Sequence, residues 1–93
     1  MLIGGDGDTL TGGSGPDTYL FRPHFGANTI TDFDTHNDNI QFDKSIFVSA
    51  DDILAHHTSD TAAGAVISDG LGDTITLAGV HQAQLSAGML LLA

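Results

Sequence analysis

Short stretches in which apolar and polar residues alternate, separated by turn residues, dominate the chain. They predict strands over residues 17–22, 28–33, 39–42, 65–68 and 74–78, with a last strand over 88–92. A short helix is predicted over 49–56, because Ser49 can cap it, Asp52 follows as in a capping box, and the acids suit the positive helix start. We expect a polar loop over 58–63, a tight hairpin turn over 69–73 and one helical turn over 82–85.

The N-terminal part repeats glycine, aspartate and a large apolar residue at a period of nine. Three pairs carry the repeat: Gly4 with Gly13, Asp8 with Asp17, and Leu10 with Tyr19. The second unit, residues 12–20, fits the pattern G-G-x-G-x-D-x-U-x, with U a large apolar residue, at every specified position. The first unit departs from this pattern at Ile3 and Asp6.

Such a pattern suits a hard cation, which prefers six to eight oxygen ligands from carboxylates, carbonyls and water. Glycines allow a turn to adopt positive φ and bring carbonyls together, and Asp8 or Asp17 then adds a carboxylate. Leu10 and Tyr19 follow as core residues of brief strands. Two units of nine would form one coil of a flattened solenoid, with an ion between successive turns on one edge.

The repeat resembles the RTX, or haemolysin-type, calcium-binding family. The resemblance implies that backbone carbonyls and one aspartate of each turn bind Ca²⁺. One half-site would then contain Gly13, Gly15 and Asp17, and the other Gly4, Asp6 through its carbonyl, and Asp8. The alternative for these residues is a pair of glycine-rich turns in a linker.

The block over residues 21–42, F-R-P-x-F-G-x-N-T-I-T-D-F-D-x-x-x-D-x-I-x-F, resembles the segment that closes the roll in many RTX proteins. The resemblance implies that Asp32 is a calcium ligand, with Asp34 and Asp38 as further candidates. The alternative role for each is to cap backbone amides of a turn. The segment 69–76 echoes the repeat without matching it and is expected to be a hairpin turn, with a weak calcium site as the alternative.

Composition supports a divalent-cation partner and excludes several others. The 93 residues contain twelve acidic residues, all Asp, and two basic ones, Arg22 and Lys44, for a net charge of −10. This charge disfavours binding to nucleic acid or to an anionic membrane surface. There is no cysteine, and no apolar run approaches the ~20 residues of a membrane span, so no membrane insertion is expected.

We expect one domain, with RTX repeats and a closing strand over 1–34 and a C-terminal cap over 35–93, at the end of a longer parent chain. The tail, GVHQAQLSAGMLLLA, resembles the C-terminal ends of RTX proteins that the type I secretion machinery exports. The resemblance implies a secreted, extracellular protein. A final core strand is the structural alternative for the tail, and both can hold together.

Enzymatic and zinc chemistry are disfavoured. His56 and His57 are adjacent, so on a helix their side chains point about 100° apart and cannot share one ion. The chain has no cysteine nucleophile, nucleophile elbow or phosphate loop. Aspartate pairs could serve a glycosidase, but here they lie on repeat turns that an ion would occupy.

The sequence therefore predicts an all-β domain in which coils of a parallel β-roll, a β-solenoid, precede a β cap with one short helix. Its expected function is calcium-dependent folding, with no enzymatic activity of its own. Two alternatives stay open: a carbohydrate-binding accessory module of a polysaccharide-modifying enzyme, and a calcium-dependent self-association module.

Overall fold

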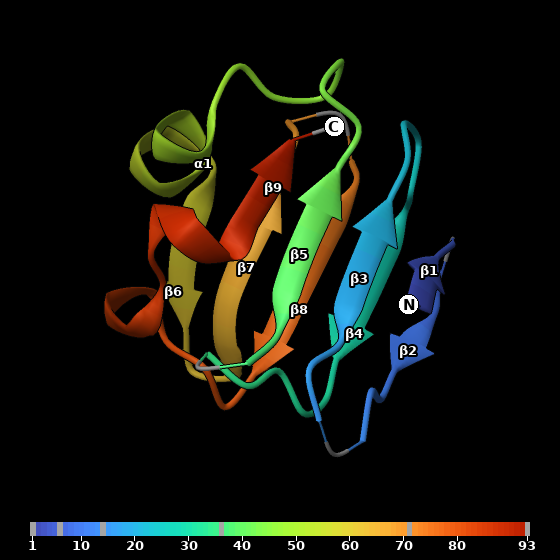
Figure 1. Cartoon of the computed structure of the whole chain (residues 1–93). Coiled ribbons are helices and arrows are strands. Elements are labelled where there is room, and N and C mark those ends of the chain that lie inside the picture. Colours follow the sequence, from blue (N-terminus) through green and yellow to red (C-terminus); the bar gives the residue numbers. More distant parts are fainter. Residues whose placement is uncertain (1, 6, 14, 36, 71, 93) are drawn as a thin grey trace.

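The computed structural model describes residues 2–5, 7–13, 15–35, 37–70 and 72–92, which form mostly strands and one short α-helix (Figure 1). One sheet is parallel throughout. Its order is β1 (Leu2–Gly4), β3 (Thr18–Phe21), β5 (Asn39–Phe42) and β9 (Leu90–Leu92).

The other sheet is mixed. Its order is β2 (Thr9–Leu10), β4 (Ala27–Ile30), β8 (Thr74–Ala78), β7 (Gly64–Ser68) and β6 (Thr58–Thr61). The first three strands run parallel to one another, whereas β8, β7 and β6 form an antiparallel meander. The prediction of a mainly-β domain with one short helix is confirmed, but this mixed sheet differs from the uniform parallel pairing of a plain solenoid.

From β1 to β5 the chain moves to the other sheet at each new strand, so parallel neighbours are separated by a whole circuit of the chain. Tyr19 therefore pairs with Ile40 in one sheet, and Leu10 pairs with Ile30 in the other. This pairing places large apolar side chains of neighbouring strands next to one another in the space between the sheets. Phe21 pairs with Phe42, and their ring centroids are 5.9 Å apart.

The helix α1 (Ala50–His56) covers one end of this core (Figure 1). Ser49 caps it as predicted, because its side chain accepts a hydrogen bond from the Asp52 amide at 3.1 Å. The Asp52 carboxylate contacts His57, with 3.1 Å between Oδ2 and Nε2. Ile53 is fully buried. Within the described ranges, no helix combines the length and the apolar character that crossing a bilayer requires.

The prediction of a polar loop over 58–63 is wrong, because residues 58–61 form β6. Its side chains are mostly exposed, so no hydrophobic alternation marks the strand, and backbone pairing with β7 alone defines it. The predicted strand over 28–33 ends at Ile30. Two 3₁₀ turns, η1 (Gln82–Gln84) and η2 (Ala87–Met89), precede β9, which begins two residues later than predicted.

The turns between the sheets gather along two edges. The first edge consists of residues 11–13 and 15–17, which lead into β3, and residues 31–35 and 37–38, which lead into β5. The second edge consists of the described residues that lead into β2, β4 and β8, namely residues 5 and 7–8, 22–26, and 69–70 and 72–73. The predicted ligand residues are distributed over these two edges.

Gly64 provides a test of the packing between β7 and β8. Its φ is +139°, and an added Cβ would clash with the carbonyl oxygen of Leu77. Gly64→Ala is expected to lower the free energy of unfolding by roughly 3 kcal/mol or more, since backbone strain and overpacking add together. Gly88→Ala is the matched control, because nothing lies within 4 Å of its added Cβ and its φ is ordinary. Urea denaturation measures both, and equal stabilities of the two variants would contradict this packing.

Candidate metal centre

The predicted half-sites lie on opposite edges of the molecule. Gly13, Gly15 and Asp17 belong to the first edge, in the turn that leads into β3. Gly4 is the last residue of β1, and Asp8 ends the turn into β2 on the second edge. Asp6 lies outside the described residues. Asp32 is on the first edge, so the structure brings it to the Asp17 turn and not to the Asp8 turn.

The turn before β3 packs closely against the Asp17 side chain. Gly13 and Gly15 have φ of +81° and +88°, values that side chains rarely allow. At Gly12 the constraint is space, because an added Cβ would lie 2.5 Å from Asp17 Oδ2 and 2.5 Å from the hydroxyl of Tyr19. The glycines therefore let the backbone close over a carboxylate and a phenol.

Asp17 has a buried carboxylate oxygen without a donor among the described residues. Within the described part of the chain, its Oδ2 has no hydrogen-bond partner. A buried polar oxygen that lacks a partner is costly, and most such atoms in folded proteins are satisfied. A cation at this oxygen would supply the missing interaction. The buried oxygen and the closely packed glycine turn therefore fit a hard metal ion.

Asp32 lies beside this turn and accepts hydrogen bonds from it. Its Oδ1 accepts hydrogen bonds from the Gly12 amide at 2.9 Å and the Tyr19 hydroxyl at 3.0 Å, and its Oδ2 accepts one from the Gly13 amide at 2.7 Å. The two backbone hydrogen bonds lower the pKa of Asp32. Burial, followed by the hydrogen bond to Asp32, raises the pKa of Tyr19. Asp32 is thus an acceptor for backbone amides, whether or not it also contacts an ion.

Asp38 has a similar role at the end of the same turn. It is 3% exposed, and its two oxygens accept hydrogen bonds from the amides of Asp17 at 2.8 Å and Asp34 at 2.9 Å. Asp34 Oδ2 accepts a hydrogen bond from the Asn37 side chain at 3.0 Å. The described contacts of Asp34 and Asp38 correspond to the turn-capping role that the sequence left open.

On the second edge, Asp8 caps its own turn. Its Oδ2 accepts a hydrogen bond from the Gly5 amide at 2.8 Å, and the residue is exposed. Asn28, the second residue of β4 and 3% exposed, reaches back to this turn, and its Oδ1 accepts a hydrogen bond from the Asp8 amide at 3.3 Å. Asp73 likewise accepts a hydrogen bond from the Gly26 amide at 2.8 Å.

The roles of Asn28 and Asp73 in joining turns were not predicted. Both begin a tripeptide of Asp or Asn, a polar residue and a large apolar residue at the start of a strand. This tripeptide occurs at 8–10, 17–19, 28–30, 38–40 and 73–75. Its spacing becomes irregular after the second copy, so a search for a period of nine does not find the later copies.

Neither the side-chain clusters nor the comparisons identify a metal centre. Among the described residues, no three His, Cys, Asp or Glu side chains form a group that could hold a metal ion. Calcium sites also use carbonyls and water, so a calcium site does not require such a group. The sequence matches no model of a protein family, and no curated protein matches it.

The hydrogen bonds to Asp32 predict acid sensitivity. Because its folded-state pKa lies below the ordinary value of 3.8, Asp32 stabilises the fold above that pH, and its contribution is lost as the pH falls towards the folded-state pKa. Asp32→Asn replaces one acceptor oxygen by an NH₂ group. It is expected to destabilise the protein at pH 7, with a difference from the wild type that shrinks below about pH 4.

Urea denaturation at several pH values measures this difference. Asp51→Asn is the control that removes the same charge from an exposed position in α1. Parallel stability curves for wild type and Asp32→Asn across this pH range would contradict the role given to Asp32.

Proposed function

We propose that this chain is a calcium-binding domain of the RTX type, whose folding depends on Ca²⁺. The observation that carries the proposal is the buried Oδ2 of Asp17, which has no described partner and lies against Gly12 in the repeat turn. Asp17 belongs to the second repeat unit, which has the full nine-residue pattern.

Asp17 would be the central ligand of this site. The backbone carbonyls of Gly13 and Gly15 are proposed ligands by resemblance to the RTX repeat, and positive φ at both residues supports a turn of the required kind. Asp32 lies on the same edge, and its carboxylate retains acceptor capacity beyond its three hydrogen bonds. Water would complete the coordination. Gly4, Asp6 and Asp8 form the proposed second half-site.

The finer fold in this proposal is a β-roll. The regular change of sheet from β1 to β5 and the parallel pairing of β1 with β3 and of β2 with β4 support roll coils in the N-terminal part. The meander β6–β8, helix α1 and the segment up to β9 would then form the cap.

The proposed mechanism is linkage between binding and folding. At a net charge of −10, aspartates that converge on the turns repel one another until a divalent cation neutralises them. When the free Ca²⁺ concentration is ten times the dissociation constant of a site, binding there adds about 1.4 kcal/mol to the free energy of unfolding. Two such sites would add a few kcal/mol, a substantial part of the total stability of a small domain. The domain would stay unfolded where calcium is scarce and fold where it is abundant.

Secretion is part of the proposal through the resemblance of the tail. An unfolded chain can pass the type I secretion machinery, and extracellular calcium would then fold it as the C-terminal end of a larger parent chain. In the folded state Leu90 is 3% exposed and belongs to β9, so the tail serves as a core strand. A segment of this kind is accessible to an exporter only before folding.

Calcium-dependent self-association is a second candidate. β1 and β2 are edge strands of the two sheets and lie at the same end of the molecule (Figure 1). Edge strands can pair with another chain. Light scattering with calcium and with chelator tests this candidate, and a monomer under both conditions would exclude it.

No contact of the described residues favours the carbohydrate-binding alternative.

Calcium is expected to raise the melting temperature of the wild-type protein and to increase its strand signal in circular dichroism, relative to chelator. Asp17→Asn is expected to lose at least one bound Ca²⁺ in calorimetry and to show a smaller rise in melting temperature. Asp51→Asn, with the same change of charge at an exposed position, should behave as wild type. Equal melting temperatures of the wild type in calcium and in chelator would refute the proposed function.

A further inference from the structure

A second buried carboxylate oxygen without a described partner lies on the other edge, outside the nine-residue repeat. Asp73, the last residue before β8, is 8% exposed. Its Oδ1 accepts a hydrogen bond from the Gly26 amide at 2.8 Å. Within the described residues, its Oδ2 has no hydrogen-bond partner.

The same hairpin turn contains a second carboxylate. Asp69 is at the other end of the same hairpin turn, and its Oδ1 accepts a hydrogen bond from the Asp73 amide at 3.3 Å. Interaction with the Asp69 side chain, and then with the Gly26 amide, lowers the pKa of Asp73. Neighbouring carboxylates repel each other when both are ionised, and a cation between them would remove that repulsion.

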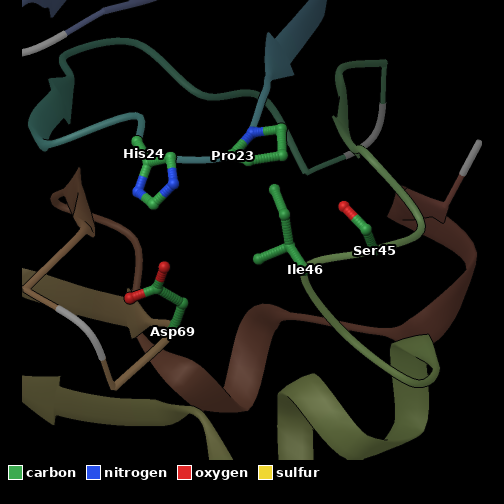
Figure 2. Close-up of a pocket in the computed structure, with 5 residues that line it drawn as sticks. All are labelled: Pro23, His24, Ser45, Ile46 and Asp69. Carbon is green, nitrogen blue, oxygen red and sulfur yellow. The ribbon is translucent and has the colours of Figure 1, made fainter.

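A pocket of about 110 Å³ lies next to Asp69. Its lining is Pro23, His24, Ser45, Ile46 and Asp69. Figure 2 shows the His24 ring and the Asp69 carboxylate pointing into the same space. This volume accommodates several water molecules, which a cation bound by only two carboxylates would need.

We propose that a hard divalent cation of the Ca²⁺ class binds between Asp69 and Asp73, beside the pocket that Asp69 lines. It would join the β7–β8 turn to the connection between β3 and β4, which Asp73 already contacts through Gly26. Zinc is a poorer fit, because the described His and Asp residues do not form a three-ligand group here. The site is independent of the Asp17 turn, which lies on the other edge.

NMR with CaCl₂ as the only added ligand tests this site in the full chain. In the wild type, the backbone amides of Gly26, Gly70 and Gly72 should shift saturably with calcium. In Asp73→Asn these shifts should disappear, whereas calcium-dependent shifts of Gly13 and Gly15 persist. In Asp17→Asn the shifts of Gly13 and Gly15 should disappear and those of Gly26, Gly70 and Gly72 persist. The experiment therefore tests the two sites independently. Asp51→Asn should change neither group of shifts.

Asp73→Asn keeps an oxygen for the Gly26 amide and places an NH₂ group where it can donate to Asp69, so it should fold in chelator. Asp69→Asn is the second variant, retains the Asp73–Gly26 hydrogen bond, and should lose the same shifts. The proposal is overturned if calcium leaves the three amides unchanged in the wild type. It is also overturned if both variants keep the shifts.

Discussion

The hydrogen bond that a backbone amide donates to an Asp or Asn side chain one turn later is the interaction on which the remaining structure depends. Asp32, Asp38, Asn28 and Asp73 each make it, on both edges of the molecule. Turn amides at the edge of stacked strands have no partner in the sheets, and buried amides require one. Such bonds are stronger when the acceptor is a charged carboxylate, as it is in the three aspartates. They set the register between turns that the parallel strands then continue.

The same device explains why the domain is so acidic and why a cation is a suitable partner. Stacked turns place carboxylates of successive circuits close together, and the chain contains only two basic residues. At most positions the amides satisfy the carboxylates. At Asp17 and Asp73 one buried oxygen of each remains without a described donor. These two oxygens, one on each edge, are where a divalent cation would contribute most to folding.

Much of the fold followed from local patterns in the sequence, because those patterns report local physics. The Ser49 cap and the alternation in β5 and β8 predicted elements that the structure contains. β6 escaped prediction, since only its pairing with β7 defines it. Asp32 was singled out as a ligand, but its partners, the amides of Gly12 and Gly13, come from a turn about twenty residues away. Such a contact depends on how the circuits stack, which the sequence pattern alone does not reveal.

The measurement that tests the central claim most directly is anomalous diffraction from crystals grown in millimolar calcium. The account predicts a calcium peak 2.3–2.6 Å from Asp17 Oδ2, a distance typical of Ca²⁺ bound to oxygen. A water molecule or no density beside that oxygen, with the Gly12–Asp17 turn unchanged, would contradict it.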